Sequence, residues 1–408
     1  MGLFRLLSIL AGVLLLQGPA LAAGEHAEAP GPCQDREAPA SLDCALAPTA
    51  TFGPSGRVWV AWAFGGHVYV NHSDDRGETF SPPVPVNRIP ERVAADGENR
   101  PKIRVGPKGT VLVSWVKRLP QPYTGHVRFA RSVDGGQTFS KPLIVNDNRA
   151  ITSHRFESFA VTDDGEVVIA WLDKRDRVAV ERQGGTYNGA ALYYAVSRDR
   201  GKSFGPNRKI ADHTCECCRT AMALDARGLP VVVWRHIYGD NIRDHALVRF
   251  EGLASPGDSV RLSHDRWRID ACPHHGPDVD AGEGTIHAVW FNNAAERHGL
   301  FYAHSAPGGR KFSSPVSVGS YEAGASHPAV LAMEERVWLA WKELAGERTR
   351  LLVKHSRDGG QTWSAPREMA ATTGSSGHPQ LLRDGAEAFV SWQTQEEGFH
   401  LIPAGIKE

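Results

Sequence analysis

Residues 166–171 are EVVIAW, a short β-branched run that ends in tryptophan, and six other segments of the chain match it. The matching runs are RVWVAW (57–62), TVLVSW (110–115), PVVVW (230–234), TIHAVW (285–290), RVWLAW (336–341) and EAFVSW (387–392). Their closing tryptophans follow one another at intervals of 51 to 63 residues. A repeat with this period indicates one supersecondary unit that is copied along or around an axis.

Each tryptophan run belongs to a unit of four short runs with turn residues between them. In one unit the other three runs are ESFAV (157–161), ALYYAVS (191–197) and RKIAD (208–212). Four short strands per repeat, with no helical periodicity, predict an all-β propeller of four-stranded blades. We expect seven blades, with six blades and an irregular extra unit as the alternative.

The last unit ends after its third run, near residue 402. A propeller ring must be closed, so we expect residues 24–43 to supply the missing strand. The propeller domain itself is then expected to span residues 44–408.

A second motif, S-x-D-x-G-x-[TS]-[FW], lies between the third and fourth runs of four units. Its copies are SDDRGETF (73–80), SVDGGQTF (132–139), SRDRGKSF (197–204) and SRDGGQTW (356–363). The motif resembles the Asp box of the sialidase superfamily (BNR-repeat) β-propellers, and the resemblance covers nearly all of the chain after residue 23. It implies a turn in which the aspartate bonds the loop backbone and the glycine adopts a positive φ. The superfamily includes hydrolases, binding proteins and assembly factors, so the fold does not assign an activity.

The N-terminus predicts export. Arg5 precedes an apolar run from Leu6 to Leu16, and ALAA follows, which is typical of a signal peptide covering residues 1–23. We expect a periplasmic or secreted protein whose mature chain has no transmembrane segment. The 46 basic and 46 acidic residues balance, which argues against a nucleic-acid partner. A small molecule or a glycan is the expected ligand.

Six consecutive units place a basic side chain where their innermost strand begins. Chain direction puts all six at the same end of the central channel, which we call the top; they are Arg100, Arg155, Arg219, His275, His327 and His378. One hypothesis is that they hydrogen-bond the crossover carbonyls and hold the blades together. The other is a ligand site, with the arginines binding an anion and the three histidines binding copper or zinc.

Three cysteines crowd the segment HTCECC (213–218), and a fourth lies in the next crossover, ACPHHGP (271–277). These cysteines are Cys215, Cys217, Cys218 and Cys272. In an exported protein we expect two disulfides among them. A soft-metal site for copper or zinc with a neighbouring histidine, His274 or His275, and a redox-active cysteine pair are the alternatives.

The other two cysteines, Cys33 and Cys44, are expected to form a separate bridge at the N-terminal closure. The C-x-C-C and C-P-x-x-G-P crossovers also resemble those of a bacterial subgroup of exported sialidase-like propellers.

The resemblance implies a catalytic set if the protein is a sialidase. Three arginines would bind a carboxylate, and Arg100, Arg155 and Arg219 are the candidates. Tyr187 would act as nucleophile and Asp173 as general acid. The three arginines come from adjacent units, whereas those of sialidases come from blades spread around the ring. Three functions therefore stand as hypotheses: a ligand-binding propeller, a sialidase-type glycoside hydrolase, and a copper or zinc protein.

Overall fold

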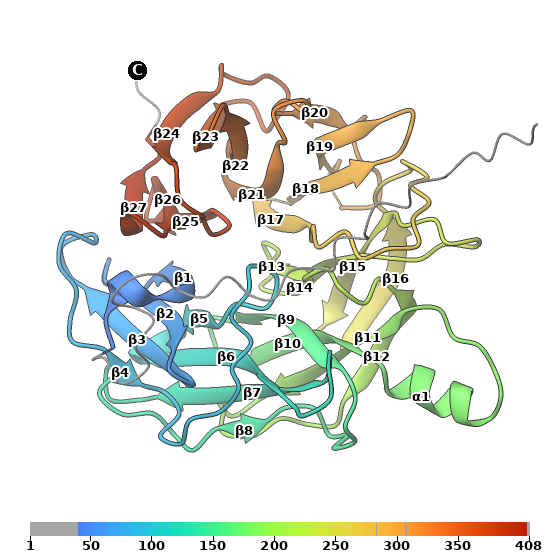
Figure 1. The fold of residues 1–408 in the computed structure, drawn as a ribbon, viewed down its shortest axis with the longest axis horizontal. Coiled ribbons are helices and arrows are strands. Elements are labelled where there is room, and N and C mark those ends of the chain that lie inside the picture. The colour runs from blue at the N-terminus through green and yellow to red at the C-terminus, as the bar shows by residue number, and fades with distance from the viewer. Residues whose placement is uncertain (1–39, 283, 307, 406–408) are drawn as a thin grey trace, which may run out of the picture.

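The computed structural model describes residues 40–282, 284–306 and 308–405. Its strands form seven antiparallel sheets around a central axis (Figure 1), and the innermost strands of neighbouring sheets contact one another. The predicted seven-bladed propeller is confirmed, and the six-bladed alternative is wrong. The predicted signal peptide (1–23) and Cys33 lie outside the described residues. The signal peptide and the bridge between Cys33 and Cys44 therefore stay predictions.

In every blade the strands follow chain order from the innermost strand to the outermost one. The first three blades are β1 (Leu46–Phe52), β2 (Val58–Phe64), β3 (His67–Ser73) and β4 (Val84–Pro85); β5 (Lys102–Val105), β6 (Val111–Arg118), β7 (Gly125–Ser132) and β8 (Leu143–Ile144); β9 (His154–Val161), β10 (Val167–Asp173), β11 (Ala190–Ser197) and β12 (Arg208–Thr214). The next two are β13 (Ala221–Leu224), β14 (Pro230–Arg235), β15 (His245–Gly252) and β16 (Ser255–Arg261); β17 (Asp278–Gly282), β18 (Thr285–Asn293), β19 (His298–His304) and β20 (Val316–Val318). The last two are β21 (Ser326–Met333), β22 (Arg336–Ala345), β23 (Arg348–Ser356) and β24 (Arg367–Thr372); β25 (Gln380–Asp384), β26 (Glu387–Thr394) and β27 (Gly398–Pro403).

The seventh sheet has three strands within the described part of the chain. Of the expected closing segment 24–43, only the last residues are described, and they lead into a 3₁₀ turn (Leu42–Cys44) that packs against β27. The first and seventh blades also meet directly. The Ala50 amide donates to the Gln380 side-chain oxygen at 3.2 Å, and Phe389 joins the apolar cluster of the first blade. A closing strand from residues 24–39 stays a prediction.

Each blade buries the tryptophan of its second strand against the preceding blade, so the core consists of apolar clusters between neighbouring blades. A buried indole N–H needs an acceptor. The seven donors and acceptors are Trp62 to Asn71, Trp115 to Glu91, Trp171 to Asp173, Trp234 to His236, Trp290 to Asp265, Trp341 to Glu343, and Trp392 to the Gly377 carbonyl.

The Asp-box turns have the geometry that the resemblance implied. In the second blade Ser132 Oγ donates to Asp134 at 2.7 Å, and Asp134 accepts the Thr138 amide at 3.0 Å. These hydrogen bonds lower the pKa of Asp134 to about 2. Gly136 has φ of +81°, and a Cβ there would lie 2.5 Å from the Trp59 ring of the preceding blade. The Asp-box glycine is therefore a contact between blades as well as a turn residue.

The loop after β10 contains a helix that the sequence analysis did not predict, α1 (Arg175–Arg182), at the edge of the ring (Figure 1). The Asp173 carboxylate accepts the Arg175 amide at 2.9 Å, and Arg177 pairs with Glu181 at 2.8 Å. The helix buries none of its residues. It is stabilised by polar contacts, so it lacks the apolar periodicity by which helices are predicted. Among the described residues, no helix has the length and apolar character needed to cross a membrane.

Substitution of two adjacent glycines separates the free-energy cost of a side chain in the turn from the cost of disturbing the contact between blades. Gly135 has φ of +71° with open space around its Cβ position, whereas Gly136 faces Trp59. We expect Gly135→Ala to destabilise the protein by about 1–2 kcal/mol through its left-handed backbone. Gly136→Ala should cost about 1–3 kcal/mol more through overpacking. Chemical denaturation of both variants measures the difference, and equal losses would contradict the blade contact.

Candidate functional site

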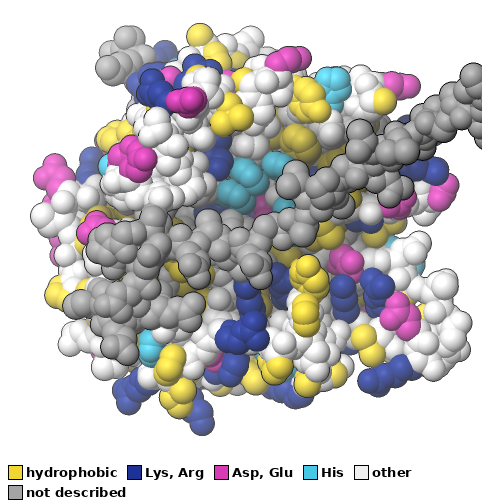
Figure 2. Space-filling view, in the orientation of Figure 1, with side chains coloured by type: hydrophobic (Ala, Val, Ile, Leu, Met, Phe, Trp, Pro, Cys, Tyr) yellow, Lys and Arg dark blue, Asp and Glu magenta, His cyan; other side chains and the backbone are white. Residues whose placement is uncertain are grey.

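Polar side chains gather at the top end of the central channel. Figure 2 shows imidazole and cationic side chains at the centre of one face of the ring. We define the top mouth by the residues that precede or begin the inner strands: Glu98, Arg100, Arg219, His275, His327 and His378. The sequence analysis named five of these six and missed Glu98.

Glu98 connects three blades. One carboxylate oxygen accepts the Arg219 amide at 2.7 Å and the Gly276 amide at 3.0 Å, and the other accepts Arg219 Nη1 at 2.8 Å. The residue is 3 % exposed. A Cβ at Gly276 would lie 2.2 Å from Arg219 Cγ, so only glycine allows this approach. The segment ENRP (98–101) contained this residue, but glutamate in a loop carries no sequence signal for burial.

Three of the predicted histidines form a stack. The ring centroids of His378 and His327 are 3.5 Å apart with an interplanar angle of 15°, and those of His327 and His275 are 4.6 Å apart with an angle of 21°. Phe291 extends the stack beyond His275 at 4.2 Å. The Nδ1 atoms of the three imidazoles are buried and have no hydrogen-bond partner among the described residues.

The stacked imidazoles are neutral at neutral pH. Burial is the main cause that lowers the pKa of each ring, and neighbouring positive groups add to it. The pKa of His275 is lowered to about 4, and those of His327 and His378 lie well below their usual value. The histidines therefore contribute hydrogen-bonding nitrogens to the mouth but no charge.

Two cations at the mouth have no carboxylate of the described residues within ion-pair distance: Arg100 and, from the neighbouring strand β22, Lys342. Arg100 donates to the Gly97 and His378 carbonyls at 3.2 and 3.3 Å, and Lys342 donates to Ser376 at 3.0 Å. In the described part of the chain neither forms an ion pair. Burial and the nearby Arg219 lower the pKa of Arg100 to about 10, and burial and Arg100 lower that of Lys342 to about 8. Glu98, Asp278 and Asp96 partly offset the charge of Arg100 from distances greater than that of an ion pair.

A cavity of about 340 Å³ opens beside the stack, between the second and seventh blades and the segment that leads into β1. Its lining includes Asp96, Arg100, Ser376, His378, Trp392 and Gln393. The lining therefore combines the partly exposed Phe399 ring, one guanidinium, two carboxyl groups and several hydroxyl and amide groups.

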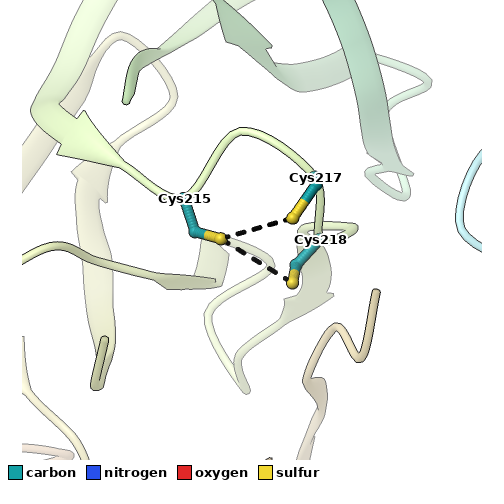
Figure 3. Close-up of side chains that lie close together, drawn as sticks. All are labelled: Cys215, Cys217 and Cys218. Carbon is teal, nitrogen blue, oxygen red and sulfur yellow. Dashed lines mark hydrogen bonds between the residues drawn. The ribbon is translucent and has the colours of Figure 1, made fainter. Parts of the chain in front are cut away.

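The four clustered cysteines lie together as predicted, but as free thiols. Figure 3 shows three of them, Cys215, Cys217 and Cys218. The Cys215 sulfur is 3.6 Å from that of Cys217 and 3.9 Å from that of Cys218, whereas a disulfide requires about 2.05 Å. These three side chains are buried and Cys272 is exposed. The two predicted disulfides are therefore not present among these four cysteines.

Known proteins share the Asp-box repeat and the fold of this chain. The BNR/Asp-box repeat family matches residues 354–365, which include the Asp box of the sixth blade. The match covers one repeat of the seven-bladed propeller. A search of curated proteins finds no match.

Solved structures share the fold of this Asp-box propeller. An ulvan lyase of polysaccharide lyase family 25, bound to -[GlcA(1-4)Rha3S]-, is 12 % identical with a TM-score of 0.59, covering 88 % of this chain and 94 % of its own. The polysaccharide lyase Uly1 is 9 % identical with a TM-score of 0.54, covering 88 % of this chain and 90 % of its own. At this identity the likeness establishes the fold alone.

The propeller does not bring the proposed sialidase set together. Asp173 is fully buried and accepts hydrogen bonds from Trp171, Arg175 and the His154 ring. Burial alone would raise its pKa, but His154 and Arg175 outweigh burial and lower it to about 2, which favours the ionised carboxylate over the proton-donating acid. It is the acceptor for the blade tryptophan instead.

Of the remaining sialidase candidates Arg100 lines the cavity, whereas Tyr187, Arg155 and Arg219 do not. Tyr187 donates to Asp212 of the outermost strand β12 at 2.6 Å. The Arg155 guanidinium lies over the Phe156 ring, 4.7 Å from its centroid. Of the three predicted arginines, Arg100 and Arg219 belong to the mouth.

A metal bound by His275, His327 and His378 requires in-plane lone pairs that converge on one point. Parallel stacked rings direct their lone pairs alongside one another, so the stack disfavours this arrangement. The set of potential ligands in this region is Glu98, His327 and His378, whose donor atoms lie within 4.8 Å of one another. Glu98 is already occupied by Arg219 and Gly276.

The lowered pKa values make folding stability depend on pH. An unfolded chain binds protons at its histidines below about pH 6.5 while the buried rings stay neutral, so stability falls as pH decreases from about 6.5 to about 4. His327→Asn removes one such ring, and asparagine tolerates the φ of +52° at this position. We expect urea unfolding of this variant to show a slope smaller by up to about 1.4 kcal/mol per pH unit.

The exposed His264 supplies the control. His264→Asn should keep the pH slope of the unmodified protein. Identical slopes for His327→Asn and the unmodified protein would contradict the neutral stack.

Proposed function

We propose that the protein binds a carboxylate-bearing sugar at the top mouth of its propeller. The observation that carries this proposal is the pair of cations, Arg100 and Lys342, that lack a carboxylate partner within the described residues. Buried charges in proteins are normally paired, because removing an isolated charge from water is costly. An anionic ligand would supply the missing partner.

The cavity suits a sugar of this kind. Its volume of about 340 Å³ lies at the small end of the usual range for ligand pockets, about 300–1,000 Å³. Phe399 is partly exposed and offers an apolar face for a sugar ring, and Ser375, Ser376 and Gln393 offer donors and acceptors for hydroxyl groups. The His378 ring lines the same space. One Arg with one Lys is a pattern that favours a carboxylate over a neutral sugar.

The fold relatives are compatible with this ligand class. The ulvan lyase with the same fold was solved with a glucuronate-containing, sulfated disaccharide. The similarity to the ulvan lyase is one of fold and does not extend to its ligand site. The proposal therefore rests on the charged residues of this chain.

We propose binding and not glycoside hydrolysis. A retaining sialidase needs a tyrosine and a proton-donating carboxylic acid at the sugar. The part of the lining that the structure describes contains no tyrosine, and of its two acids, Asp43 and Asp96, Asp96 has a lowered pKa. Burial alone would raise that pKa, but the Asn99 amide and Arg155 outweigh burial. The sialidase hypothesis would return if the protein released sugar from a sialoside.

Isothermal titration calorimetry tests the ligand class. We expect a glucuronate oligosaccharide or free sialic acid to bind, and a glucose oligosaccharide of equal length to bind at least tenfold more weakly. Arg100→Gln should weaken acidic-sugar binding by about ten- to a hundredfold, because a charge-assisted hydrogen bond contributes about 1.5–3 kcal/mol. Lys342→Met, from the sixth blade, should act in the same direction.

Arg104→Gln is the matched control, because Arg104 is also an arginine of the second blade with a pKa lowered by burial, but it bonds its own strand at Ile103 and does not line the cavity. The affinity of the Arg104→Gln variant for the acidic sugar should equal that of the unmodified protein. Equal affinity for acidic and neutral sugars, or unchanged affinity in both Arg100→Gln and Lys342→Met, would overturn the proposed function.

A further inference from the structure

We propose that Cys215, Cys217, Cys218 and Cys272 bind one soft, closed-shell metal ion, Cu(I) or Zn(II), through their sulfur atoms. This thiolate site is separate from the sugar site of the mouth and does not depend on it. The donor set is of the type that selects these ions, since soft thiolate ligands favour Cu(I) and Zn(II) over harder cations.

The sulfur–sulfur distances fit a shared metal better than a covalent bond. They are 3.6 Å for Cys215–Cys217 and 3.9 Å for Cys215–Cys218, and all three sulfurs lie within 4.8 Å of one another. Metal–sulfur bonds of about 2.3 Å in a tetrahedral site put neighbouring sulfurs about 3.8 Å apart. The three buried sulfurs already occupy three corners of such a site.

The neighbouring crossover offers a fourth ligand and the entrance. Cys272 and His274 form a second set with Cys217, again with donor atoms within 4.8 Å. Cys217 belongs to both sets, so its sulfur connects the ligands of the two crossovers. Cys272 and His274 are exposed, and a metal ion can reach the buried sulfurs from their side. We assign the fourth ligand to Cys272.

Two arginines next to the sulfurs have no carboxylate partner among the described residues. Arg243 Nη1 lies 3.2 Å from Cys215 Sγ and donates to it. Arg235 is 2 % exposed, its Nε is unpartnered, and its other donors reach the carbonyls of Arg243, His275 and Phe291. Four thiolates around one ion leave a net negative charge of two or three. The two guanidinium groups are placed to offset it, as groups around a metal site commonly do.

The backbone holds both crossovers in place without a metal ion. The Cys215 amide donates to the Arg235 carbonyl at 2.8 Å, and the Arg243 amide donates to the Trp267 carbonyl at 2.7 Å. Asn241 Nδ2 donates to the Ile269 carbonyl at 2.9 Å. Binding therefore requires the thiols to release their protons but little rearrangement of the chain.

The test is a metal titration of the full chain, purified without oxygen in the presence of reductant and freed of metal by a chelator. We expect one Cu(I) or one Zn(II) per chain in competition with a chromogenic chelator, and Co(II) in the zinc position should show the visible bands of tetrahedral thiolate coordination. Cys217→Ser should lower the affinity at least a hundredfold. Cys272→Ser, at an exposed position, gives the same test if Cys217→Ser does not fold.

Further variants separate this site from its surroundings. Arg243→Met should weaken binding about tenfold through the lost hydrogen bond to sulfur. Arg100→Gln, at the mouth, should leave metal binding unchanged, so the metal site and the sugar site can fail independently. The proposal is overturned if neither metal binds stoichiometrically. It is also overturned if binding survives both cysteine variants, or if the folded protein forms two disulfides among these cysteines and cannot bind metal when reduced.

Discussion

The contact on which the rest of this structure depends is the tryptophan that each blade inserts against the blade before it. Seven indoles occupy the same position in the repeat, and each N–H must find a buried acceptor. The acceptor differs from blade to blade, from Asn71 to Glu343 to a backbone carbonyl, because only the position of the donor is imposed by packing. In the third blade this requirement accounts for the buried Asp173, whose other partners, His154 and Arg175, keep the carboxylate charged. A residue of the type expected in catalysis is here part of the blade contact.

The ring also decides which side chains share the channel. Every inner strand begins at the same end, so basic residues from successive blades converge there although they are far apart in the chain. Glu98 binds Arg219 and the Gly276 amide, which satisfies one of the cations and joins three blades. Arg100 and Lys342 have no such partner in the described chain, and the stacked imidazoles beside them are kept neutral by burial. The mouth therefore combines unpaired positive charge with neutral nitrogen donors and acceptors.

The mouth and the cysteine cluster are built from the same two crossovers. Arg219 directly follows Cys218, and Gly276 lies two residues after His274, so both crossovers meet at Glu98. Arg235 reinforces this connection by donating to the His275 carbonyl from the strand that also holds the Cys215 amide. The two proposed sites therefore share one rigid frame while using different ligands. Their neighbouring positions are a consequence of chain connectivity and not evidence for a common ligand.

The sequence by itself determined the blade, because the tryptophan runs and Asp boxes describe contacts that recur in every repeat. It also determined which residue types lie at the top, since the direction of each strand follows from the repeat. Tertiary structure alone decided which of those residues meet. Glu98 lies in the loop before β5, and its burial depends on two other blades. The helix α1 was not predicted because it buries no apolar face, and the separation of Tyr187 from the mouth arises from its place beside an outer strand. The cysteine spacing indicated a cluster, but whether its sulfurs pair covalently depends on distances between two crossovers about 55 residues apart, which no local pattern specifies.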